Sequence, residues 1–134
     1  MKPVMFIAGE ASGDNNAADV IRALGGRVPV FGVGGPKMKA AGMELLFDLT
    51  EHAVVGFVEV LKNYRKFKGF FDQLLAEVGR RQPSAVVLVD FPGFNLRFAK
   101  AVKRRYPQTK VIYYISPQLW AWHASRRSEE HTSE

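Results

Sequence analysis

Apolar residues along this chain fall into two kinds of pattern, short continuous runs and longer segments with helical spacing. Strands that are buried on both faces of a parallel sheet carry few polar side chains, so the short runs predict strands. Glycine, proline and charged residues bound most of these runs and favour turns there. We expect strands at residues 3–8, 28–33, 45–47, 85–89 and 110–115.

In the longer segments apolar residues recur every three or four positions, which predicts amphipathic helices. We expect helices at residues 13–24, 37–41, 57–80 and 94–105. Ser12 is expected to cap the first helix, and Gly25 and Gly26 to end it. Strands that alternate with helices predict an α/β fold, a Rossmann-like parallel sheet with flanking helices and right-handed crossovers.

Acidic residues beside glycine follow two of the predicted strands. Residues 9–14 read Gly-Glu-Ala-Ser-Gly-Asp, and residues 90–95 read Asp-Phe-Pro-Gly-Phe-Asn. Open α/β folds bind their ligands at the carboxyl edge of the sheet, which is where both segments begin. The two segments therefore predict one cleft.

The residues alone leave two roles open for each segment. Asp90 suits a general base held at the end of a strand, and it equally suits a cap on the helix that follows. The amides of Ser12, Gly13 and Asp14 suit a phosphate at a helix N-terminus, or simply a tight turn. Glu10 and Asp14 would repel a phosphate unless they face a sugar hydroxyl or a helix. The first segment lacks the G-x-G-x-x-G spacing, so we expect no NAD.

Composition narrows the possible partners. The 134 residues are 47% apolar, which suits one globular domain, and no apolar run approaches the roughly 20 residues that span a bilayer. A net charge of +6 favours an anionic partner: nucleic acid, a phosphorylated metabolite or acidic lipid. The chain has no cysteine and its three histidines lack ligand spacing, so we expect no metal and no other cofactor.

Five motifs, in this order, resemble those of the lipid-A-disaccharide synthases. They occupy residues 8–14, 32–38, 54–61, 90–95 and 113–122, so the resemblance runs from residue 3 to about residue 126. One motif departs from a common family form, because Gly93 stands where a second acid often occurs. This departure weakens any mechanism that needs two carboxylates there and leaves Asp90 alone.

The resemblance implies a hexosyltransferase of the GT-B class, with two Rossmann-like domains facing a cleft. Such enzymes join UDP-2,3-diacylglucosamine to 2,3-diacylglucosamine 1-phosphate, with inversion, and release lipid A disaccharide 1-phosphate and UDP. Asp90 would be the general base, and Glu10 would orient the acceptor or a partner side chain. Further substrate contacts are expected from Gly9, Ser12, Gly13, Asp14, Asn95, Ser116 and Gln118.

By the same resemblance, residues 1–126 would form part of the N-terminal, acceptor-side domain, and the chain alone would be inactive. Residues 127–134 match no part of the family and resemble the translation of a sequencing-library adapter, so we expect a disordered, non-native tail. Two alternatives stay open: another two-domain nucleotide-sugar enzyme, such as a sugar epimerase, or a basic α/β module that binds nucleic acid. An RNP-like or helix-turn-helix pattern would favour the latter, and neither occurs, so we expect no nucleic acid.

The resemblance also implies a cytoplasmic protein that is peripheral on the anionic inner membrane of a Gram-negative bacterium. The helix predicted at residues 57–80 pairs an apolar stripe with several cations, which suits a bilayer surface but equally suits a solvated helix face. The residues expected to contact the membrane are Phe57, Val58, Lys62, Arg65, Lys66, Lys68 and Phe70.

Overall fold

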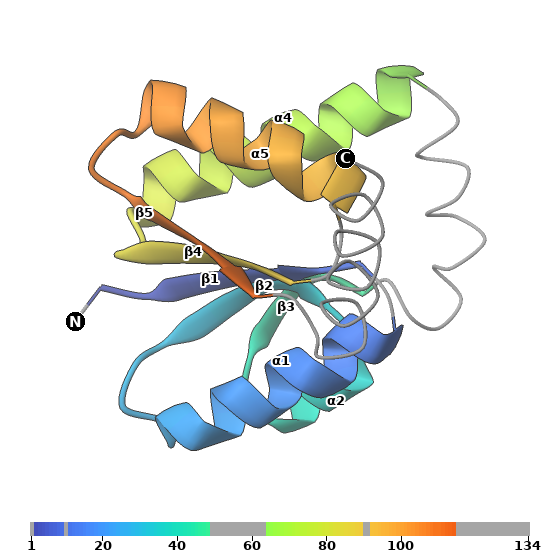
Figure 1. Cartoon of the computed structure of the whole chain (residues 1–134), viewed down its shortest axis with the longest axis vertical. Helices are drawn as coiled ribbons and strands as arrows, with labels where there is room; N and C mark the ends of the chain where they lie inside the picture. Colours follow the sequence, from blue (N-terminus) through green and yellow to red (C-terminus); the bar gives the residue numbers. More distant parts are fainter. Residues whose placement is uncertain (1, 10, 49–63, 90–91, 115–134) are drawn as a thin grey trace, which may run out of the picture.

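The computed structural model describes residues 2–9, 11–48, 64–89 and 92–114. Five parallel strands form one sheet in the order β3-β2-β1-β4-β5. Helices α1 and α2 cover one face of this sheet, and α4 and α5 cover the other (Figure 1). The predicted Rossmann-like α/β fold is therefore confirmed. The strands are β1 (Val4–Ala8), β2 (Val30–Gly34), β3 (Glu44–Asp48), β4 (Ala85–Val89) and β5 (Lys110–Tyr114).

The helices are α1 (Ala11–Leu24), α2 (Pro36–Ala40), α4 (Tyr64–Arg81) and α5 (Pro92–Arg105). Helix α1 begins two residues earlier than expected, so Ser12 lies in its first turn and the prediction that Ser12 caps it is wrong. Helix α5 also begins two residues early, because proline suits the first helical turn, where its missing N–H costs nothing. The tail predicted at residues 127–134, and residues 57–63 of the predicted long helix, lie outside the described residues.

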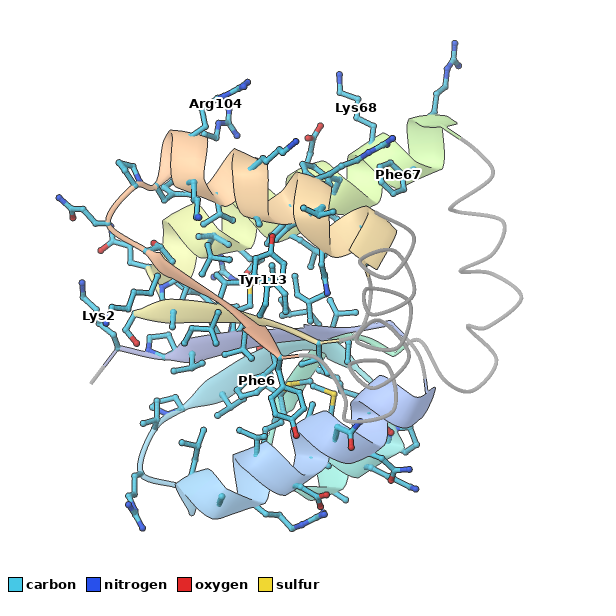
Figure 2. All side chains as sticks on the ribbon, viewed as in Figure 1. Lys2, Phe6, Phe67, Lys68, Arg104 and Tyr113 are labelled. Atoms are coloured by element: carbon cyan, nitrogen blue, oxygen red, sulfur yellow. The ribbon has the colours of Figure 1, made fainter. Side chains whose placement is uncertain are left out.

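The side chains of β1 alternate between two hydrophobic clusters, one on each face of the sheet. Met5 and Ile7 join the cluster under α4 and α5, whereas Phe6 and Ala8 join the cluster over α1 and α2. Figure 2 shows Phe6 on the α1 side of the sheet. Because successive side chains on a strand point to opposite faces, this five-residue strand contributes to both halves of the core.

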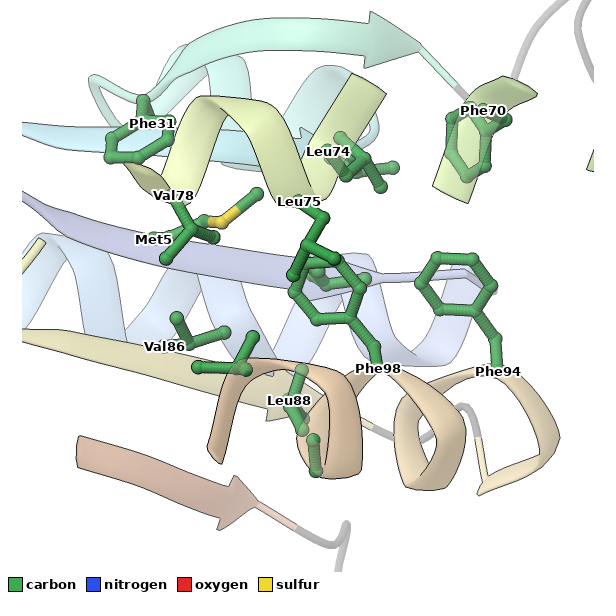
Figure 3. Packing of buried hydrophobic residues seen from close by; sticks show 14 residues of the cluster. Met5, Phe31, Phe70, Leu74, Leu75, Val78, Val86, Leu88, Phe94 and Phe98 are labelled. Carbon is green, nitrogen blue, oxygen red and sulfur yellow. The ribbon is translucent and has the colours of Figure 1, made fainter. Parts of the chain in front are cut away.

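Phenylalanine rings join α4 to α5. The centroid of the Phe94 ring lies 5.7 Å from those of Phe70, Phe71 and Phe98, and 5.8 Å from that of Phe67. Figure 3 shows Phe70 and Phe94 facing each other across this interface. Phe70 is only 6% exposed, so the expectation that it lies at the surface and contacts a membrane is wrong. Its ring is part of the core because α5 covers that side of α4.

Strand β2 carries a glycine, Gly32, that pairs with Phe6 of β1. A Cβ atom on Gly32 would lie 1.9 Å from the carbonyl oxygen of Phe6, and its φ is +150°. Only glycine fits both constraints. The register between β2 and β3 also shifts between Gly32 and Val33.

An ion-pair network links the C-terminal end of α4 to β3. Arg81 contacts Glu77 and Glu44, each at 2.7 Å, and its guanidinium lies 4.7 Å from the centre of the Phe31 ring. The hydrogen bond from Arg80, with a smaller contribution from Arg81, lowers the pKa of Glu77 below its usual value of 4.5. Across the described ranges, no helix is both long enough and apolar enough to cross a membrane.

Candidate functional site

The strand order reverses direction between β1 and β4. From β1 the chain continues outward to β2 and β3, and from β4 it continues the other way to β5. Open α/β sheets bind ligands at the carboxyl ends of the strands where such a reversal occurs. The last residues of the two strands, Ala8 and Val89, are register partners, so both strands end at the same level. The two segments singled out in the sequence, 9–14 and 90–95, start from these adjacent strand ends.

Helix α1 brings its first turn close to both strand ends through Gly13. A Cβ atom on Gly13 would lie 3.4 Å from the Cβ of Ala8 and 3.6 Å from the carbonyl oxygen of Val89. These are ordinary van der Waals distances, and they show that the helix N-terminus lies directly against the switch point. Free N–H groups and the helix dipole make such an N-terminus attractive to anions.

The carboxylate of Asp14 is buried and binds the start of α2. Its Oδ1 accepts hydrogen bonds from the backbone N–H groups of Gly35, at 3.0 Å, and Met38, at 2.9 Å. Its Oδ2 accepts one from the N–H of Lys37, at 3.1 Å. Asp14 is 3% exposed, so this negative charge is compensated inside the protein by the N-terminus of α2.

This capping arrangement was not expected from the sequence. The residue that precedes α2, Gly35, has no side chain to cap it, and Asp14 supplies the cap from 21 positions earlier. The signal in the sequence was the Gly-Gly-Pro start of α2 without a capping residue of its own. Asp14 thus fixes the loop between β2 and α2 to the first turn of α1. A contact between Asp14 and a substrate stays a prediction.

Asn95 is the second buried polar side chain near this edge. It lies in the first turn of α5, which begins three residues after β4 ends, and it is 2% exposed. Within the described part of the chain, its Oδ1 atom has no hydrogen-bond partner. A buried acceptor without a donor costs stability, so such a group calls for an explanation.

Apart from Ser12, four of the predicted site residues lie at the carboxyl edge: Gly9, Gly13, Asp14 and Asn95. Ser12 lies in the first turn of α1 at the same edge. On α4, Arg65 and Lys68 are exposed, and Figure 2 shows Lys68 on the side of the helix away from the sheet. Lys66 lies on α4 as well. Seven predicted residues lie outside the described residues: Glu10, Phe57, Val58, Lys62, Asp90, Ser116 and Gln118.

Among the residues that the structure describes, no group of three or more His, Cys, Asp or Glu side chains could hold a metal ion. The strand reversal, the helix N-terminus packed against it and the buried polar side chains define a Rossmann-like domain. Its binding edge lies at the carboxyl ends of β1 and β4.

Comparison with known proteins identifies the family. Residues 4–132 match the family model for lipid-A-disaccharide synthetase, so the chain belongs to this family. It is 46% identical over 128 residues to the lipid-A-disaccharide synthase of Trichlorobacter lovleyi, covering 93% of this chain and 33% of the relative. The chain is also 45% identical over 130 residues to the lipid-A-disaccharide synthase of Koribacter versatilis, covering 94% of this chain and 34% of that relative.

Lipid-A-disaccharide synthase 1 of Legionella pneumophila (strain Lens) is 40% identical over 126 residues, with 92% of this chain and 33% of the relative covered. The chain therefore spans about a third of the length of these relatives, which fits part of a larger enzyme. The family resemblance noted in the sequence is confirmed. The comparisons support neither a sugar epimerase nor a nucleic-acid-binding module.

Proposed function

We propose that this chain is the acceptor-side part of a hexosyltransferase in lipid A biosynthesis. The complete enzyme joins UDP-2,3-diacylglucosamine to 2,3-diacylglucosamine 1-phosphate, giving lipid A disaccharide 1-phosphate and UDP. The pairing of Ala8 with Val89 carries the proposal, because it brings the two family motifs to one edge of the sheet. Family membership supplies the reaction, since a fold alone does not define a function.

In the proposed reaction, Asp90 is the general base. It takes the proton from the acceptor hydroxyl as the hydroxyl oxygen attacks the anomeric carbon of the donor sugar, and UDP leaves from the opposite face. A carboxylate next to the end of a buried strand suits this task, because the strand fixes its distance from the acceptor. Glu10, which follows the end of β1 by two positions, is proposed to orient the acceptor.

The described residues support proposed contacts for the substrates. The N-terminal amides of α1 are proposed to meet a phosphate, because Gly13 in the first turn of this helix packs against the ends of β1 and β4 and Gly9 directly follows β1. The unpartnered Oδ1 of Asn95 is proposed to accept a hydrogen bond from a hydroxyl or amide of the acceptor. Ser116 and Gln118 follow the end of β5, which pairs with β4, and are proposed to line the same edge.

We also propose that the complete protein is cytoplasmic and peripheral on an anionic inner membrane. The proposed contact residues exclude the buried Phe70 and are Phe57, Val58, Lys62, Arg65, Lys66 and Lys68. The exposure of Lys68 supports this surface, and each cation close to an anionic bilayer contributes roughly 1 kcal/mol. Flotation with anionic vesicles at low salt tests it, comparing the protein with a variant that carries glutamate at positions 65, 66 and 68. Equal flotation of the two proteins would remove this helix from the membrane contact.

A chimera tests the enzymatic proposal, because the chain spans only a third of its relatives. In the chimera, residues 4–126 replace the matching segment of the T. lovleyi enzyme, and UDP release is followed with both diacylated sugars. We expect turnover by the chimera and none by the 134-residue chain alone, since catalysis needs both substrates held together.

Asp90→Asn in this chimera should reduce the rate by roughly a hundred- to ten-thousand-fold, the usual contribution of a general base. The matched control is Asp19→Asn, which removes an exposed carboxylate from α1 and should leave the rate unchanged. An Asp90→Asn chimera that stays within a few fold of its parent would show that Asp90 is a helix cap and not the base.

A further inference from the structure

A cavity of about 450 Å³ opens at the amino edge of the sheet, opposite the candidate site. Its walls include the residues just before three strands, Lys2 before β1, Ser84 before β4 and Thr109 before β5. The ends of α4 and α5 complete it through Gln82 and Arg105. Figure 2 shows Lys2 at this end of the sheet. The volume falls within the roughly 300–1,000 Å³ typical of pockets for small ligands.

The lining carries two cations, Lys2 and Arg105, and no acidic residue. Neither cation forms an ion pair with a residue in the described part of the chain. Arg105 lies in the last turn of α5, where a helix dipole already favours a cation, so its position alone does not indicate a ligand. The hydroxyl groups of Ser84 and Thr109 add neutral donors and acceptors to the same lining.

Tyr106 and Thr109 form part of one wall of the cavity. The ring of Tyr106 packs over α4 at Gly79, where a Cβ atom would lie 2.4 Å from the tyrosine oxygen. The N–H of Thr109 donates to the carbonyl oxygen of Tyr106 at 3.0 Å, which holds the turn between α5 and β5. An aromatic ring held in this way offers a flat apolar surface beside the polar groups.

The backbone of Gln82 gives a second, independent observation. Its φ is +47°, and its N–H closes α4 by donating to the carbonyl oxygen of Val78 at 2.9 Å. Glycine is the usual residue at such a left-handed helix end, and a following proline, here Pro83, further disfavours helical angles. Gln82, which has a side chain, therefore adopts a backbone conformation that favours glycine, and this residue lines the cavity.

We propose that this cavity binds a small hydroxylated anion of the sugar-phosphate class. Lys2 and Arg105 hold the phosphate, the Gln82 amide and the Ser84 hydroxyl bond the sugar hydroxyls, and the Tyr106 ring packs against the sugar. The site lies at the opposite edge of the sheet from the proposed catalytic residues. It therefore does not depend on the proposed transferase function, and binding involves no covalent step.

The test is a titration of the ¹⁵N-labelled 134-residue chain, followed by its amide resonances. The probes are glucose 1-phosphate, inorganic phosphate and glucose. We expect glucose 1-phosphate to shift the amides of Ser84, Arg105 and Thr109 saturably. Inorganic phosphate should bind roughly tenfold more weakly and glucose more weakly still, since each lacks part of the contacts. Equal binding of phosphate and glucose 1-phosphate would overturn the sugar part of the proposal.

Variants locate the site. Arg105→Gln should weaken binding roughly tenfold, whereas Arg104→Gln, the same change one position away and outside the cavity, should have little effect. If both variants weaken the binding of glucose 1-phosphate equally, the anion is attracted to a basic helix in general and the proposed site is wrong. Amide resonance shifts confined to Gly9 and Gly13 would also overturn the site. Lys2→Gln provides the same test if Arg105→Gln does not fold. Gln82→Gly should weaken binding without lowering stability, and unchanged binding would remove Gln82 from the site.

Discussion

Replacing Asp14 should destabilise this domain far more than replacing any exposed acid on the same helix. The Asp14 carboxylate accepts three backbone hydrogen bonds, from Gly35, Lys37 and Met38, at 2.9–3.1 Å. In Asp14→Ala all three N–H groups lose their acceptor at the start of α2. In Asp14→Asn the Oδ1 atom can still serve Gly35 and Met38, but an N–H donor then faces the N–H of Lys37.

The size of the expected loss of stability follows from the type of hydrogen bond. A hydrogen bond to a charged group contributes about 1.5–3 kcal/mol, so three independent bonds would give about 4.5–9 kcal/mol. They are not independent, because they share one carboxylate, and because water can reach the exposed Lys37. We therefore expect a loss of about 3–4 kcal/mol for Asp14→Ala and about 1.5–2 kcal/mol for Asp14→Asn.

Urea denaturation, followed by far-ultraviolet circular dichroism, measures this loss. With a slope of about 2 kcal/mol per molar urea, a loss of 3 kcal/mol lowers the midpoint by about 1.5 M. The matched control is Asp19→Ala, because Asp19 is exposed and forms its ion pair with Arg22 on the surface of α1. Its midpoint should move little, since such pairs contribute at most about 1 kcal/mol. Equal shifts for the Asp14 and Asp19 variants would refute the capping argument.

Three further predictions concern stability, each measured by urea denaturation. Gly32→Ala should lower the free energy of unfolding by about 3–5 kcal/mol, because its Cβ would lie 1.9 Å from the Phe6 oxygen. A urea midpoint near that of the parent would contradict the close approach. Gln82→Gly should raise the free energy of unfolding by about 0.5–1 kcal/mol, because glycine adopts the positive φ of this position without strain. A lower free energy of unfolding would argue against strain at Gln82. Glu77 contributes stability above pH 4.5 that is lost at lower pH, because its pKa is lowered in the folded state. The free energy of unfolding of the parent should therefore exceed that of Glu77→Gln by roughly 0.5–1 kcal/mol at pH 7. A difference between the two proteins that stays constant down to pH 3 would contradict this.

The strands were the most predictable part of the fold. Residues 85–89 form β4 as expected, because five consecutive apolar residues lie between polar ones and are all buried. Helix starts were less predictable: α1 and α5 both begin two residues before the expected position. Small residues and proline in a first turn leave no apolar periodicity to read, and hydrogen bonds to the following turn decide where the helix begins.

The order of the strands and the burial of Phe70 could not be predicted, because both depend on contacts between segments that are distant in the sequence. Spacing along the predicted helix placed Phe70 beside the apolar stripe, but only the position of α5 determines which side of that stripe is covered. The same holds for Asp14, whose partners lie 21 to 24 positions away. By contrast, the edge of the sheet that carries the candidate site was predictable, because each motif follows a strand directly and parallel strands end at the same edge.

The start of α5 shows how this domain can keep an unsatisfied polar group beside its candidate site. The buried Oδ1 of Asn95 lacks a donor in the described part of the chain, which costs about 1–3 kcal/mol. The preceding residue, Phe94, contacts four other phenylalanine rings at 5.7–5.8 Å. Each such ring pair contributes about 0.5–1.5 kcal/mol beyond the burial of its area, so the four together offset the cost of Asn95. The aromatic cluster therefore holds the first turn of α5 in place despite the unsatisfied acceptor beside it.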